Sequence, residues 1–206
     1  MLNNITYIFK LPASIKMSEQ IKIALNKKLE LPDQLFNLFW SKLKPAVIAK
    51  GDMFLVQGKV SHNLALVEKG AFYSFYEKDG NEIIEGFCFE GCFMTDYPSY
   101  LTNSVSKKNF KALENSNILT ISNKELQALY SENVLFERAG RLMAENLFAT
   151  WEIKLQDTIF LTPTERYQKL LKNSNNLIQR VPQYLIASFL NITPQYLSQI
   201  RRKIIS

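Results

Sequence analysis

The chain has 206 residues, of which 47% are hydrophobic and 21% are charged, so it is long enough for one large or two small globular domains. No apolar run approaches the ~20 residues that a membrane-spanning helix needs, and residues 1–16 lack the basic and apolar regions of a signal peptide. Two cysteines are too few for a disulfide framework. These features predict a cytoplasmic protein without a membrane partner.

The net charge of +6 is concentrated at the C-terminal end. Residues 1–160 hold 18 basic and 18 acidic side chains, whereas residues 161–206 hold seven basic side chains and the single acid Glu165. A neutral region followed by a basic one is typical of a protein with one polyanion-binding module. Like charges can also form a solvated face, but their confinement to one end favours the binding interpretation.

The first two thirds of the chain combine helices with a strand-rich region. Apolar residues at helical spacing predict helices over residues 17–44, with a restart at Pro32. From Ala46 to Ile121, six of the seven glycines separate short stretches rich in β-branched and aromatic residues. This pattern predicts six or more strands in a β-barrel or jelly roll. Asp79-Gly80-Asn81 is the strongest hairpin signal.

A long helix is predicted over about residues 133–158, which contain no proline. Its apolar positions recur every three or four residues, and Phe136, Phe148 and Trp151 form a second apolar surface. Such a helix exceeds the usual ~11–12 residues. We expect packing on the β domain on one side and a coiled-coil-like dimer seam on the other, the alternative being a core helix of a monomer. The expected seam residues are Leu135, Ala139, Leu142, Met143, Leu147 and Thr150.

The C-terminal region predicts several short helices. Residues 161–166 (LTPTER) have the spacing of a capping box that begins a helix. Residues 177–182 (LIQRVP) have the composition of a short strand. Helices over 183–190 and 193–204 then flank a tight turn at Asn191-Ile192, and asparagine tolerates the left-handed conformation that such a turn requires.

The most specific stretches are LVEKGAFYSFYEKDGNEIIEGFCFEG, LTPTERYQKLL and VPQYLIASFLNITPQYLSQIRRKI. On these, and on the order of elements from about residue 19 onward, the chain resembles the Crp/Fnr family of bacterial transcription regulators, with the last two similar to regulators common in Bacteroidetes. The resemblance implies an α+β fold: an N-terminal β-roll (jelly roll, cyclic-nucleotide-binding-like) joined by a long dimerisation helix to a C-terminal helical helix-turn-helix domain. The expected divisions are an N-terminal extension (1–16), the sensor roll with flanking helices (17–130), the dimerisation helix (131–158) and the DNA-binding domain (159–206).

The resemblance implies that a homodimer places two recognition helices in successive major grooves of double-stranded DNA, with RNA polymerase as a further partner. Leu197 and Ile200 should face inward. Gln195 and Gln199 can bond the N6/N7 edge of adenine, worth ~1–3 kcal/mol of discrimination, so we expect A·T-leaning readout. The expected DNA-contacting residues, whose cations mostly hold phosphates, are Thr193, Gln195, Tyr196, Ser198, Gln199, Arg201, Arg202 and Lys203.

Family members that bind cyclic nucleotides carry a Gly-Glu pair for the ribose, followed by Arg-Ser or Arg-Thr for the phosphate. Here Cys92 follows Gly91 where the glutamate belongs, and Ser106 or Lys107 stands near the arginine position. We therefore expect another small-molecule effector, or none, rather than cyclic AMP. The lysines of this candidate pocket could attract an anion. Its residues are Gly91, Cys92, Phe93, Thr95, Asp96, Tyr97, Lys107 and Lys108.

Other chemistries find little support in the sequence. An iron–sulfur cluster needs about four cysteine ligands, and the chain has only Cys88 and Cys92, which either belong to the barrel or form a redox pair. The one histidine, His62, is expected at the surface. Without a metal-ligand cluster, a G-x-S-x-G motif or a P-loop, we predict no enzyme and no cofactor. The competing interpretation is a ligand-sensing or protein-interaction module whose C-terminal helices pack on a partner and no longer bind DNA.

Overall fold

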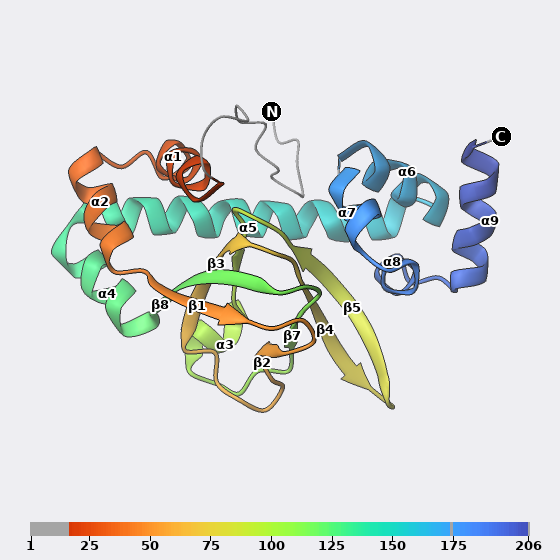
Figure 1. Ribbon diagram of the computed structural model, residues 1–206, viewed down its shortest axis with the longest axis horizontal. Helices are drawn as coiled ribbons and strands as arrows, with labels where there is room; N and C mark the ends of the chain where they lie inside the picture. The colour runs from red at the N-terminus through yellow and green to blue at the C-terminus, as the bar shows by residue number, and fades with distance from the viewer. Residues whose placement is uncertain (1–16, 174, 206) are drawn as a thin grey trace.

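The computed structural model describes residues 17–173 and 175–205 (Figure 1); the extension expected over residues 1–16 lies outside them. The helices are α1 (Met17–Leu29), α2 (Asp33–Ser41), α3 (Tyr97–Thr102), α4 (Asn123–Glu132), α5 (Val134–Phe160), α6 (Pro163–Asn173), α7 (Asn175–Arg180), α8 (Gln183–Phe189) and α9 (Pro194–Ile205). The strands are β1 (Lys44–Ile48), β2 (Met53–Leu55), β3 (Asn63–Lys69), β4 (Phe72–Lys78), β5 (Asn81–Cys88), β6 (Phe93–Met94), β7 (Asn109–Ala112) and β8 (Ser116–Ser122).

The expected β-roll is confirmed as two four-stranded antiparallel sheets within the described residues. Their strand orders are β1-β8-β3-β6 and β2-β7-β4-β5. The sheets enclose a core in which Val67, Phe72 and Ile118 are almost fully buried. Because successive residues of a strand point to opposite faces, the branched and aromatic residues of these short strands meet between the sheets.

The hairpin predicted at Asp79-Gly80 joins β4 to β5, with Lys78 paired to Asn81. Both turn residues have positive φ, 52° for Asp79 and 74° for Gly80. A two-residue turn with this backbone matches the right-handed twist of the flanking strands, which explains the Asp-Gly preference. The tip of the hairpin points away from α5, and β5 lies on the side of the roll that faces α8 (Figure 1).

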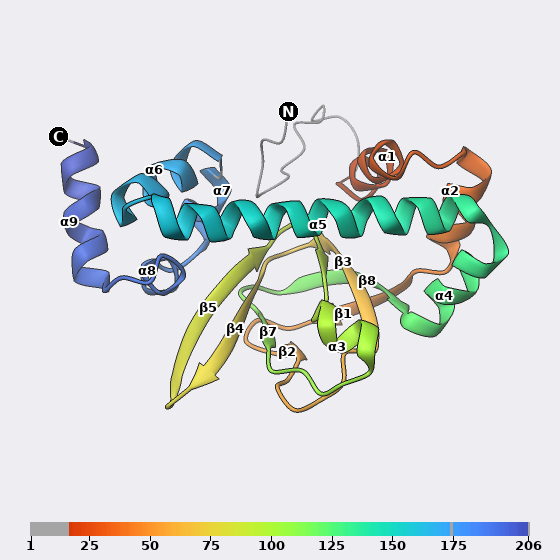
Figure 2. The same cartoon turned by 180° about the vertical axis from the view of Figure 1, so that it is seen from behind.

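Helices α1, α2 and α4 pack around the N-terminal part of α5 (Figure 2). Pro32 stands at the N-cap of α2, so the predicted helix restart is confirmed. Phe36, Phe39 and Phe136 are buried in one cluster with residues of the roll. Gly140 permits close packing here, because a Cβ at this position would lie 2.3 Å from the Tyr130 hydroxyl oxygen.

Helix α5 is 27 residues long, which confirms the long helix predicted over about residues 133–158. It begins after Asn133, whose side chain accepts a hydrogen bond from the Leu135 amide. Figures 1 and 2 show α5 running along the whole molecule, with the roll beside it and α6–α9 around its C-terminal end. The helix therefore connects the roll to the C-terminal helices in one rigid element.

The predicted capping box at the start of α6 is confirmed, since Thr162 and Glu165 exchange hydrogen bonds. The short strand predicted over residues 177–182 is wrong, because α7 covers the segment to Arg180. Leu177 and Val181 lie one helical turn apart and are both buried, so tertiary packing overrides the strand-like composition. Apolar spacing in six residues is too short to separate helix from strand.

Candidate nucleic-acid interface

Helix α9 follows α8 across a tight turn in which Asn191 adopts the left-handed conformation, with φ 55°. The Thr193 hydroxyl oxygen accepts a hydrogen bond from the Tyr196 amide at 3.2 Å, so Thr193 caps the helix as predicted. Leu197 and Ile200 are 1% and 2% exposed. They share a cluster with residues of α8, which confirms that this face of α9 is turned inward.

The opposite face of α9 carries exposed polar side chains. Gln195 and Gln199 are one helical turn apart, both are exposed, and their amides bond nothing within the described chain. Tyr196, Arg202 and Lys203 are also exposed, as is Thr193 at the start of the helix. Arg201 is half-buried, and the Ser198 hydroxyl donates back to the Pro194 carbonyl. The predicted DNA-contacting residues thus form one accessible surface, with Arg201 at its margin.

Arg166 of α6 supports this arrangement in a way that the sequence did not reveal. Its Nη2 donates to the carbonyl of Leu190, the last residue before the turn, at 3.0 Å. The carbonyls at a helix C-terminus lack intrahelical partners, and the half-buried Arg166 supplies one here. In the sequence Arg166 counts only as one more cation, because its partner lies 24 positions away.

In the candidate ligand pocket, buried charges pair with one another. The Lys108 Nζ lies 2.9 Å from the Glu85 carboxylate and 4.0 Å from that of Asp96, and the side chains of all three are 10% exposed. The Ser74 hydroxyl donates to the other Glu85 oxygen. Burial lowers the pKa of Lys108, but the charge of Glu85 and its hydrogen bond outweigh burial, so the pKa is raised. Lys108 is therefore a paired cation inside the roll.

The remaining residues of this candidate pocket do not gather around Lys108 as an anion site. Lys107 is exposed although its neighbour is buried. Burial raises the pKa of the Cys92 thiol, and Gly91 forms a turn with φ 79°. The Thr95 hydroxyl donates to the Asn63 carbonyl, and Phe93 and Tyr97 pack against the core.

Lys154 and Trp151 of α5 lie at the junction of α5, β5 and α8; the sequence predicted Trp151 only as part of an apolar surface and gave no role to Lys154. The Lys154 ammonium donates to the Glu85 carbonyl and lies 4.6 Å from the Trp151 ring centroid and 5.2 Å from that of Phe189. Lys108 lies 5.6 Å from the same Trp151 centroid. Burial lowers the pKa of Lys154. Contacts between distant segments carry no local sequence signal, so the sequence alone does not predict this junction.

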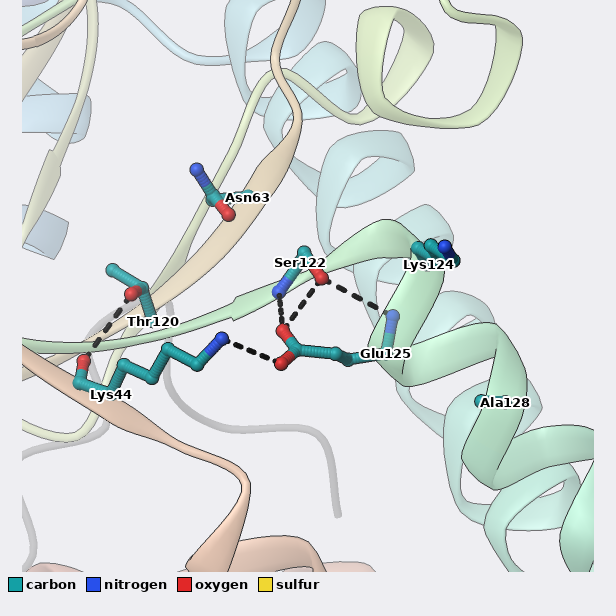
Figure 3. Close-up of a pocket in the computed structure, with 7 residues that line it drawn as sticks. All are labelled: Lys44, Asn63, Thr120, Ser122, Lys124, Glu125 and Ala128. Atoms are coloured by element: carbon teal, nitrogen blue, oxygen red, sulfur yellow. Dashed lines mark hydrogen bonds and ion pairs between the residues drawn. The ribbon is translucent and has the colours of Figure 1, made fainter.

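An open hollow elsewhere on the roll is lined by residues of β1, β3, β8 and α4 (Figure 3). Lys44 and Glu125 form an ion pair of 2.7 Å across it, and Ser122 and Glu125 form the capping box of α4. The hydrogen bonds from Lys44 and Ser122 lower the pKa of Glu125 to about 2. These side chains satisfy one another and begin a helix, so we assign no ligand to the hollow.

The residues predicted for the dimer seam share one broad face of α5, but their burial differs along the helix. Ala139 is buried within its own chain, and Leu135 and Met143 pack against the same core. Leu142 and Thr150 are half-buried, and Leu147 is exposed. The exposed apolar residues of the C-terminal part of α5 form what we call the α5 stripe: Leu147, Phe148, Trp151, Leu155, Ile159 and Phe160.

Residues 17–173 and 175–205 hold neither a membrane-spanning helix nor a metal-binding cluster. No helix in these ranges is long and apolar enough to cross a membrane. The same ranges contain no group of three or more His, Cys, Asp or Glu side chains placed to hold a metal ion. His62 is exposed, as expected.

Comparison with known proteins identifies the fold. No protein-family model and no curated protein sequence matches the chain. Among solved structures, the c-di-GMP-responsive global regulator CLP of Xanthomonas campestris matches with a TM-score of 0.63 at 16% identity, covering 84% of this chain and 91% of CLP. The Thermus thermophilus catabolite activator protein matches with 0.54 at 19%, covering 86% of each chain. FixK2 of Bradyrhizobium japonicum matches with 0.63 at 16%, covering 79% and 84%. The chain therefore has the fold of the Crp/Fnr-type regulators, with a cyclic-nucleotide-binding-like roll, a long connecting helix and C-terminal helices.

Proposed function

We propose that the protein is a sequence-specific, DNA-binding transcription regulator of the Crp/Fnr type, acting in the cytoplasm as a homodimer. The observation that carries the proposal is the outer face of α9, where Gln195 and Gln199 are exposed and make no bond within the described chain. Glutamine is suited to the major-groove edge of adenine. Arg202 and Lys203, one turn further along, are suited to phosphates. RNA polymerase is a further partner in this proposal.

The proposal excludes cyclic AMP as the controlling effector. In the candidate pocket the ammonium of Lys108 is already paired with Glu85 inside the roll, and its side chain is 10% exposed. An ammonium also lacks the planar fork with which an arginine binds a phosphate in two places. A cyclic phosphate would have to break a buried ion pair to gain a weaker contact. A small effector of other chemistry remains part of the proposal.

The α5 stripe supports dimerisation through a second copy of the chain. Phe148, Trp151, Leu155 and Ile159 are spaced by three, four and four residues, close to the repeat of a coiled-coil seam. Leu155, Ile159 and Phe160 are 56%, 65% and 77% exposed, which is unusual for such large apolar side chains on one helix. We expect Leu155→Asp to convert a dimer into a monomer in analytical ultracentrifugation. The neighbouring Gln156→Asp is the control and should remain dimeric; two monomeric or two dimeric variants would contradict this assignment.

The test of DNA recognition is selection from a pool of random duplexes by the purified full chain, with sequencing, at two salt concentrations. We expect a palindrome with adenine-rich half-sites about one helical turn apart. The logarithm of the affinity should fall with the logarithm of salt by about 0.9 for each phosphate contact. A protein-interaction module would recover no motif and show little salt dependence.

Gln199→Ala sharpens the same experiment. We expect the loss of about 1–3 kcal/mol of discrimination at one base pair of the selected site, with other positions unchanged. Gln168→Ala removes another exposed glutamine, on α6, and serves as the matched control. Equal effects of the two substitutions, or an unchanged preference in Gln199→Ala, would contradict the role of Gln199 in reading bases.

A further inference from the structure

The helix-turn-helix and the roll share one hydrophobic cluster. Ile84 and Phe89 of the roll are buried together with Leu185 and Ile186 of α8. The rings of Phe87 and Phe189 lie 5.4 Å apart at the edge of this cluster. The C-terminal helices are therefore packed directly against the roll, in addition to being connected through α5.

A serine of α8 completes the outer edge of the sheet. Within the described residues, β5 pairs with β4 only, which leaves its other edge without a strand. There the Ser188 hydroxyl donates to the Glu82 carbonyl at 3.1 Å and accepts from the Ile84 amide at 3.2 Å. Unpaired edge groups need a partner, and α8 supplies it.

Arg180 of α7 makes a two-point ionic contact with the roll. Its Nη1 and Nη2 lie 2.8 and 2.9 Å from the two carboxylate oxygens of Glu90, and Nη2 also contacts the Glu114 carboxylate. The guanidinium carbon lies 5.1 Å from the Phe89 ring centroid. Arg180 and Glu90 are 24% and 21% exposed, so water screens this pair only partly. Planar two-point pairing of this kind is specific to arginine.

The two carboxylates that bind Arg180 come from two different turns of the roll, and one of them also binds a third turn. Glu90 lies between β5 and β6, Glu114 lies between β7 and β8, and Glu90 also accepts the amide of Gly70 between β3 and β4 at 2.9 Å. Gly70 has φ 115°, and a Cβ there would lie 2.1 Å from the Ser116 hydroxyl oxygen, so this turn requires glycine. The Arg180 guanidinium thus connects α7 directly to the turns that carry Glu90 and Glu114, and through Glu90 to the turn at Gly70.

We infer that Arg180 is a positioning residue that holds the helix-turn-helix (α8 and α9) in one orientation on the roll. It thereby sets the position of α9 relative to α5. The inference rests on the proposed function. The exposed face of α9 stays accessible in this docked arrangement, which is consistent with docking that favours DNA binding. A palindromic operator requires both recognition helices at a set spacing, whereas non-specific binding requires only phosphate contacts.

The experiment uses the full chain with Arg180→Gln, and Lys172→Gln as a control that removes an exposed cation from the same domain. Affinity is measured for the operator selected by the wild type and for an unrelated duplex of equal length. Because hydrogen bonds to charged groups are among the stronger ones, we expect operator affinity to fall about tenfold or more in Arg180→Gln. Non-specific affinity should change no more than in the control.

Hydrogen exchange measures the docking of the C-terminal helices on the roll without DNA. The Ile84 amide bonds Ser188 only while the domains are docked, so its hydrogen exchange should accelerate in Arg180→Gln and not in Lys172→Gln. Glu90→Gln, which keeps the side-chain shape, should show both effects more weakly, and it replaces Arg180→Gln if that variant does not fold.

Unchanged or increased operator affinity, an equal loss for both duplexes, or unchanged exchange at Ile84 would each overturn the inference. If the wild-type protein selects no operator, the proposed function fails. In that case the exchange measurement alone decides whether Arg180 holds the docked arrangement.

Discussion

Polar side chains are paired and buried in the interior of the roll, whereas on the outer face of α9 they are exposed. Inside the roll, Lys108, Glu85 and Ser74 bond one another and are largely removed from water. On α9, Gln195 and Gln199 are exposed and bond no other described residue. A buried polar group must find a partner within the chain, whereas an exposed one bonds water and can exchange it for a ligand. This difference is the reason that the proposed binding surface is on α9 and not inside the roll.

The largest expected effect comes from breaking the ion pair inside the roll. Glu85→Ala leaves the Lys108 ammonium buried, with Asp96 at 4.0 Å as its remaining acidic partner, and should lower the free energy of unfolding by about 3–5 kcal/mol. Glu85→Leu combined with Lys108→Met removes both charges and should be much less destabilising. Urea unfolding measures both variants. If the double variant is as unstable as Glu85→Ala, the pair does not act as described.

A smaller effect is expected at the exposed end, and on DNA affinity rather than stability. Arg202→Ala should weaken binding uniformly across sequences and reduce the salt slope by about 1, because one phosphate contact is lost. Its free energy of unfolding should stay within about 0.5 kcal/mol of the wild type, since the side chain is exposed. Lys59→Ala, an exposed cation of the roll, is the control. A base-specific loss in Arg202→Ala would assign Arg202 to base reading instead.

The smallest effect is the pH dependence of the contact between Glu90 of the roll and Arg180 of α7. Burial raises the pKa of Glu90, but the hydrogen bonds from Arg180 and the Gly70 amide outweigh it, so the pKa lies below its ordinary 4.5. The ionised carboxylate therefore stabilises the folded state above pH 4.5, and this stabilisation is lost as pH falls through the lowered pKa.

The corresponding measurement compares Glu90→Gln with the wild type by urea unfolding over a series of pH values. At neutral pH the variant should be less stable, and the difference should shrink progressively below pH 4.5. Glu137→Gln changes an exposed carboxylate of α5 and is the control. A difference that is constant with pH would show that the charge of Glu90 is not what stabilises the contact.

Elements with strong local signals were predictable from the sequence. The Asp79-Gly80 turn, the restart at Pro32 and the capping box at Thr162 each depend on residues within a few positions of one another. The secondary structure of residues 177–182 was not predictable, because six residues with apolar and branched side chains fit a strand as well as a helix. Packing of Leu177 and Val181 against the shared cluster decided for the helix.

The candidate site divides in the same way. The face of α9 was predictable because helical spacing separates Leu197 and Ile200 from Gln195 and Gln199 without reference to the rest of the chain. Asp96 and Lys108 were named as pocket residues, but the partner that occupies Lys108, Glu85 of β5, was not. The dimer seam was assigned to residues such as Ala139, which the chain itself buries. Periodicity shows that a helix has an apolar face and does not show what covers it.

By itself, the sequence determined the order of elements apart from residues 177–182, the location of the excess charge and the exposed position of Gln195 and Gln199 on α9. These follow from spacing, turn chemistry and composition, which act over a few residues. Only the tertiary structure decided that Lys108 is paired inside the roll, that α8 closes the edge of β5, and that Arg180 joins α7 to Glu90, which also binds the Gly70 turn. Those contacts connect positions between 20 and 106 residues apart. Contacts between residues so far apart in the chain cannot be predicted from local spacing and composition.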